Sequence, residues 1–134
     1  MAGYINLLAI LIAVVVYMIL GFLWYSPVFF GKTWMKFVGK KPKDLKKNLS
    51  TAYIGSLISA IVMALILTAF INFAGAAGIG GGALVGLLAW LGFVASTNLV
   101  NSIFSDRPAQ LYFIDMGYHL ISLIIMGGII GAFA

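Results

Sequence analysis

Two ionisable side chains lie four residues apart in an apolar segment near the end of the chain. Asp115 and His119 belong to the stretch QLYFIDMGYHLIS, in a sequence with only three acidic residues and one histidine. At this spacing a carboxylate and an imidazole share one helix face, where they can exchange a proton near neutral pH. Because ionisable groups inside apolar helices are costly, a functional role is the first hypothesis for this pair.

Other polar residues accompany the pair. The candidate cluster comprises Asn98, Asn101, Asp115, Tyr118, His119 and Ser122. One helix face is predicted to carry Tyr112, Asp115, His119 and Ser122. Counted outward from a short turn at residues 105–110, Asn101 matches Asp115 in depth and Asn98 matches His119. We therefore expect the two amides to donate to the carboxylate and to fix the tautomer of the imidazole.

Three interpretations of this cluster stay open. The first is a hydrogen-bonded pin that sets the register of two neighbouring helices. The second is a site for a proton or a small solute in a transporter, channel or sensor. The third is a metal site, for which one histidine and one aspartate are too few unless subunits share them. Nothing in the sequence resembles a catalytic set or a phosphate-cradling loop, so we expect neither an enzyme nor a cofactor.

The segments that position these residues are long and apolar. Hydrophobic residues make up 63% of the 134 residues and charged residues 8%, against about 45–50% and 25% in soluble domains. Helices are predicted at residues 4–25, 52–73, 83–104 and 111–133, each long enough to cross a hydrocarbon core of about 30 Å. The expected fold is all-α, a compact bundle of four transmembrane helices in one domain, residues 1–134. A flexible, uncharged turn is expected at residues 74–82.

Basic residues gather between the first two apolar segments. Seven of the eight lie there, namely Lys32, Lys36, Lys40, Lys41, Lys43, Lys46 and Lys47, and the eighth is Arg107. Lysines mixed with aromatic residues are typical of a segment in the headgroup layer, which favours anionic lipid as the partner over nucleic acid. A helix is expected to begin near Asp44 and continue into the membrane. An interfacial motif is predicted from Trp24, Tyr25, Pro27 and Trp34.

The same lysines predict how the chain is oriented. Short loops rich in lysine and arginine stay in the cytoplasm, so the first and third loops should be cytoplasmic and both termini outside. The expected location is an inner (cytoplasmic) membrane of the bacterial type, crossed several times. Small residues spaced four apart predict helix contacts, some of which would serve a homo-oligomer. These pairs are Gly55/Ser59, Gly82/Gly86, Gly92/Ser96 and Gly127/Gly131.

Two stretches resemble a known family. GFLWYSPVFFGKTWMKFVGK at residues 21–40 and LVNSIFSDRPAQLYFIDMGYHLISLIIMGGIIG at residues 99–131 are similar to the signatures of DUF1761, small bacterial membrane proteins of unknown function. The resemblance implies a four-helix membrane domain over nearly the whole chain, and no activity. It directs attention to Trp24, Tyr25, Pro27, Gly31, Trp34, Asn98, Arg107, Gly117, Tyr118 and His119.

The functional expectation combines these observations. Transport or sensing of a proton or small solute through the polar cluster is the first hypothesis, with an unidentified small-molecule ligand. The alternative is a membrane scaffold or interaction protein that uses its lysine-rich loop.

Overall fold

The computed structural model describes residues 5–39 and 49–134, and all regular structure in these ranges is helical. The helices are α1 (Leu7–Trp24), α2 (Gly31–Val38), α4 (Leu49–Ala74), α5 (Gly78–Ala89), the π-helix η1 (Trp90–Ala95), α6 (Ser96–Phe104) and α7 (Ala109–Ala132). Four helical spans are long and apolar enough to cross a membrane, with α5, η1 and α6 forming one continuous span. This confirms the predicted all-α membrane fold.

The glycine-rich segment between the second and third spans is mostly helical. The predicted turn at residues 74–82 is therefore wrong in extent, because α5 already begins at Gly78. Gly75 and Gly78 have φ values of 65° and 79°, a left-handed conformation that glycine adopts without a steric penalty. In lipid the backbone must satisfy its own hydrogen bonds, which favours extending the helix over a long open turn.

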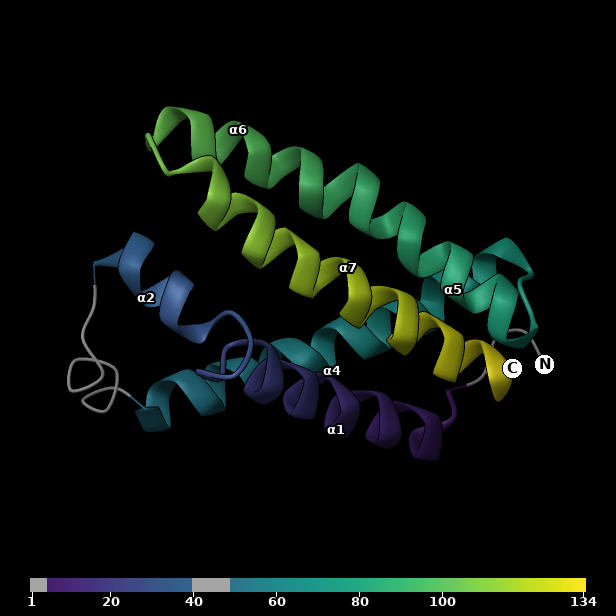
Figure 1. Ribbon diagram of the computed structural model, residues 1–134. Helices are drawn as coiled ribbons and strands as arrows, with labels where there is room; N and C mark the ends of the chain where they lie inside the picture. Colours follow the sequence, from purple (N-terminus) through teal and green to yellow (C-terminus); the bar gives the residue numbers. More distant parts are fainter. Residues whose placement is uncertain (1–4, 40–48) are drawn as a thin grey trace.

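Helix α7 is the central element of the bundle. Figure 1 shows it, in yellow, between α5 and α6 on one side and α1 and α4 on the other. Half of its apolar span is buried, against 28% for the spans of α1 and α4. The shared core includes Tyr17 of α1, Leu67 of α4, and Tyr118 and Met126 of α7. The polar residues of the last predicted helix are therefore presented to several neighbours at once.

The closest helix contact joins α5 to α7 through glycines. A Cβ atom placed on Gly82 would overlap the backbone oxygen of Gly127, and one on Gly86 would overlap that of Leu123. Gly131 meets the backbone of α5 in the same way. Two of the predicted small-residue pairs, Gly82/Gly86 and Gly127/Gly131, thus form one backbone-to-backbone contact, as expected where lipid provides no hydrophobic drive.

A tight turn connects α1 to α2. The carbonyl of Ser26 accepts hydrogen bonds from the amides of Phe29 and Gly31, at 3.1 and 2.9 Å. A Cβ atom on Gly31 would overlap the carbonyl oxygen of Tyr25, so only glycine fits where α2 begins. The predicted end of the first helix before Pro27 is confirmed, since α1 ends at Trp24. The expected helix start near Asp44, and the lysines at positions 40–47, lie outside the described residues.

Candidate functional site

Asp115 joins three segments at one end of the bundle. Its Oδ1 atom accepts a hydrogen bond from the Tyr25 hydroxyl at 2.6 Å, directly after α1. Its Oδ2 atom lies 3.4 Å from a guanidinium nitrogen of Arg107, in the turn between α6 and α7. The Asp115 side chain is 18% exposed. We call Tyr25, Arg107 and Asp115 the Asp115 network.

The Tyr25 ring links this network to α2 and to the core. It packs edge-on against Trp34 of α2 and against Tyr118 of α7, with centroids 5.5 Å apart in both cases. Burial raises the pKa of the Tyr25 phenol above its ordinary value, and the hydrogen bond to Asp115 and the charge of that carboxylate raise it further. The phenol therefore stays protonated and donates its hydrogen to the carboxylate.

The turn that carries Arg107 is held by backbone bonds. The Arg107 amide donates to the Ser102 carbonyl at 3.0 Å, and Asp106 adopts a left-handed φ of 54°. Aspartate tolerates that conformation better than most residues, because its short side chain can bond locally. Pro108 then precedes the first turn of α7. These features place the guanidinium beside a carboxylate that lies eight residues further along the chain.

The prediction that Asn98 and Asn101 donate hydrogen bonds to Asp115 and His119 is wrong. Asn98 donates to the Val94 carbonyl of its own helical span at 2.8 Å, and Asn101 is exposed. The asparagines lie at the expected depth along the bundle, but α6 packs much less closely against α7 than α5 does. Their side chains therefore do not bond to the carboxylate or the imidazole. Large side chains from Trp90 and Tyr112 bridge the two spans at this end, whereas the other end is closed by glycines.

The side chains on the predicted polar face of α7 bond to two different neighbouring segments. The Tyr112 hydroxyl donates to the Ala95 carbonyl of η1 at 2.8 Å, whereas Asp115 bonds to the end of α1. Tyr118 is 6% exposed, and its hydroxyl donates to the Tyr17 carbonyl of α1 at 3.0 Å. His119 is half-buried against the Tyr118 ring, and Ser122 is fully buried.

Two indole groups hold α7 from different sides, a role that the sequence analysis missed. Trp24 donates to the Ile114 carbonyl at 3.0 Å, and Trp90 donates to the Met116 carbonyl at 2.9 Å. Trp24 was predicted to mark a membrane interface, and it also lies directly over Gly117. The sequence offered one sign of this role. Trp90 lies inside an apolar segment, where an indole N–H usually requires a hydrogen-bond partner.

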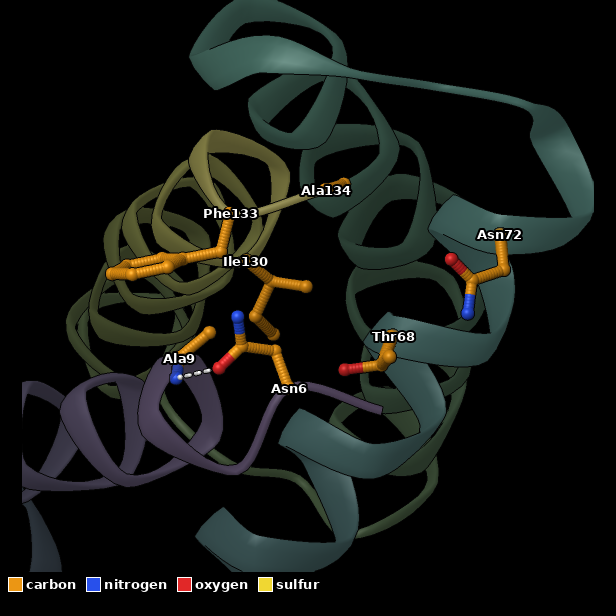
Figure 2. Close-up of a pocket in the computed structure, with 7 residues that line it drawn as sticks. All are labelled: Asn6, Ala9, Thr68, Asn72, Ile130, Phe133 and Ala134. Carbon is orange, nitrogen blue, oxygen red and sulfur yellow. Dashed lines mark hydrogen bonds between the residues drawn. The ribbon is translucent and has the colours of Figure 1, made fainter. Parts of the chain in front are cut away.

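A small cavity lies at the opposite end of the bundle. Figure 2 shows Asn6, Thr68 and Asn72 around it, together with Ile130, Phe133 and Ala134 of the last segment. Its volume of about 10 Å³ is close to the minimum that a cavity needs to hold one water molecule. Among the described residues no three histidine, aspartate or glutamate side chains lie close enough together to hold a metal ion.

The four apolar spans and the polar network at one end define the chain as a small polytopic membrane protein. A family model described as a protein of unknown function (DUF1761) matches residues 8–131, nearly the whole chain. The chain belongs to this family, which confirms the resemblance of its two signature stretches. Comparison with curated proteins gives no match, and comparison with solved structures gives none either.

Proposed function

We propose that this membrane protein is a non-enzymatic sensor of protons that works through the Asp115 network. The observation that supports the proposal is the pair of bonds that Asp115 makes to Tyr25 and Arg107. A single carboxylate thereby connects α1, the turn before α7, and α7 itself. Such a group can convert a change of charge into a change in how three segments are held.

Protonation would act through charge and hydrogen bonding. A neutral carboxyl group loses its attraction for Arg107 and accepts a weaker hydrogen bond from Tyr25. Because the Tyr25 ring also contacts Trp34, a loosened Tyr25 would loosen α2. His119, one turn further along α7, is placed to take up or deliver the proton.

Replacement of Asp115 tests this proposal. The chain has no cysteine, so a single Thr33→Cys substitution on the exposed side of α2 can carry an environment-sensitive fluorophore. We expect its emission to change with pH in the otherwise native chain and to stay constant in Asp115→Asn. Loss of the charge-assisted hydrogen bond should also lower the free energy of unfolding by about 1–2 kcal/mol.

Asp106→Asn is the matched control, since it removes the same charge from an exposed position in the adjacent turn. Its fluorophore should keep the full pH response. A pH response of native size in Asp115→Asn would overturn the sensor. Proton flux into liposomes with an internal pH dye, present in the native chain and absent in Asp115→Asn, would assign transport instead.

A scaffold that docks through its lysine-rich loop is the second candidate. It is supported by α2, which exposes Lys32 and Lys36 while Trp34 and Phe37 on the same helix are half-buried. In that case glutamine at these two lysines would change where the protein accumulates in the cell, while Asp115→Asn would change only stability. Normal localisation of the double lysine variant would argue against the scaffold.

The sidedness of the loops can be measured with single cysteines. We propose that the turn carrying Arg107 and the loop carrying the lysines face the cytoplasm, because positive charge is retained there. In intact cells an impermeant maleimide should then label Ala77→Cys in the opposite turn, and label Ser105→Cys only after permeabilisation. Labelling of Ser105→Cys in intact cells would reverse this orientation.

We also propose that the chain forms a homo-oligomer in the membrane. Cβ atoms placed on Gly55 and Gly92 would meet no atom within 4 Å. Unlike the glycines between α5 and α7, these two small-residue positions are therefore open to a second copy. Sedimentation equilibrium in detergent would measure the mass, and a monomer at all concentrations would contradict the proposal.

A further inference from the structure

Three cations lie at the end of the bundle that carries Asp115. Lys32 and Lys36 are exposed on α2 and flank Trp34, whose ring contacts Tyr25. Arg107 reaches the same network from the turn between α6 and α7. Figure 1 places α2 and this turn at the same end of the molecule. Among the described residues this end carries two carboxylates against these three cations, Asp115 and the exposed Asp106 beside Arg107, so its net charge is positive.

The turn before α2 presents an apolar tip beside these cations. Val28 is 86% exposed and Phe29 58% exposed, although hydrogen bonds to Ser26 and Trp24 hold the turn in a defined shape. An exposed apolar tip followed by lysines matches a surface that is apolar on one side and negatively charged on the other. The headgroup layer of a bilayer has this chemistry, whereas a soluble anion offers only the charge.

Arg107 is the cation best placed to recognise a phosphate. Its side chain is 39% exposed, and its distance of 3.4 Å to Asp115 is long for an ion pair, since charge-assisted N–H···O bonds are usually about 2.7–2.9 Å. A guanidinium carries five N–H donors in a planar fork that matches phosphate geometry. The contact with Asp115 engages one terminal nitrogen, so this partly exposed guanidinium keeps further donors for a second anion.

We propose that Arg107, with Lys32 and Lys36, binds the phosphate of an anionic phospholipid, and that Asp115 competes with this phosphate for Arg107. This site goes beyond proton sensing, because it requires the charge of Asp115 but no titration of it. Lipid binding would draw Arg107 away from the carboxylate. Removal of the carboxylate charge would make Arg107 more available to the lipid.

The competition predicts a gain of binding, which misfolding would not produce. The chain is placed in phosphatidylcholine nanodiscs and titrated with dansyl-labelled phosphatidylglycerol, and energy transfer from tryptophan reports binding. Asp115→Asn should bind this lipid about fivefold more tightly than the native chain, and Arg107→Gln about fivefold more weakly, as expected for one cation near an anionic headgroup. The double variant should bind like Arg107→Gln alone.

A matched control separates this site from general charge. Asp106→Asn removes one exposed acid and should give clearly less gain than Asp115→Asn. Equal effects of site and control variants, or a gain that survives in the double variant, would overturn the proposal. Equal competition by inorganic phosphate would overturn the assignment to lipid. If the site variants bind the lipid like the native chain while the fluorophore on α2 keeps its pH response, the lipid site is rejected and the sensor proposal is unaffected.

Discussion

Gly82→Ala is expected to separate α5 from α7. The added methyl group would overlap the backbone oxygen of Gly127 and lie 2.9 Å from the Gly131 Cα. Neither atom can move away by changing a rotamer, so the two helices must part along their closest contact. Overpacking usually costs about 1–3 kcal/mol, and a clash with backbone should reach or exceed the upper end of that range. Thermal unfolding in detergent, followed by circular dichroism, would measure the loss.

Gly80→Ala provides the comparison on the same helix. A Cβ atom there meets no atom within 4 Å. Alanine is also intrinsically more favourable than glycine inside a helix. The Gly80→Ala variant should therefore unfold at or slightly above the native temperature. Equal stability of the two alanine variants would show that α5 and α7 do not meet through their backbones.

Tyr118→Ala is expected to have the second large effect. Its buried ring contacts Tyr17 at a centroid distance of 5.2 Å, and its hydroxyl donates to the Tyr17 carbonyl. The same ring is an edge-on partner of Tyr25 in the Asp115 network. Removing a buried aromatic side chain costs about 3–5 kcal/mol, and urea unfolding in mixed micelles would measure the change. Tyr118→Phe, which removes only the hydroxyl, should cost about 1 kcal/mol.

Gly21 provides a test of the geometry around this hydroxyl. A Cβ atom on Gly21 would lie 2.7 Å from the Tyr118 hydroxyl oxygen and 3.3 Å from the ring carbon that bears it. Gly21→Ala should therefore be destabilising in the native chain and better tolerated when combined with Tyr118→Phe. The pair should cost less than the sum of the single changes. Strict additivity would mean that the hydroxyl does not occupy this place.

The predictable part of the fold rests on length, apolarity and small residues. The four spans follow from uninterrupted apolar segments, and their observed ends differ from the predicted ones by a few residues. The contact faces of α5 and α7 follow from the spacing of Gly82, Gly86, Gly127 and Gly131, and the structure shows that these two faces meet. These signals are local, so each can be recognised without knowing where the other helices lie.

The partners of Asp115 could not be predicted in the same way. Tyr25 is ninety positions away in the sequence, and the bond between them depends on how α1 and α7 are rotated toward each other. The amides of Asn98 and Asn101 have suitable chemistry and depth. Their failure to reach Asp115 depends on the separation of α6 from α7, which neither residue determines. Spacing along one helix identifies a face, and the packing of the bundle decides which neighbour that face meets.

The π-helix at residues 90–95 has a consequence for comparisons within the family. A turn closed by i→i+5 bonds contains one more residue than an α-helical turn, so each residue after it is displaced by about 100° around the axis. Deletion of one residue there would restore α-helix and rotate residues 96–104 by that amount relative to the glycine face of α5. Relatives that differ by a single residue at this point should therefore be aligned with the gap inside η1, and their α6 would present a different side to the lipid.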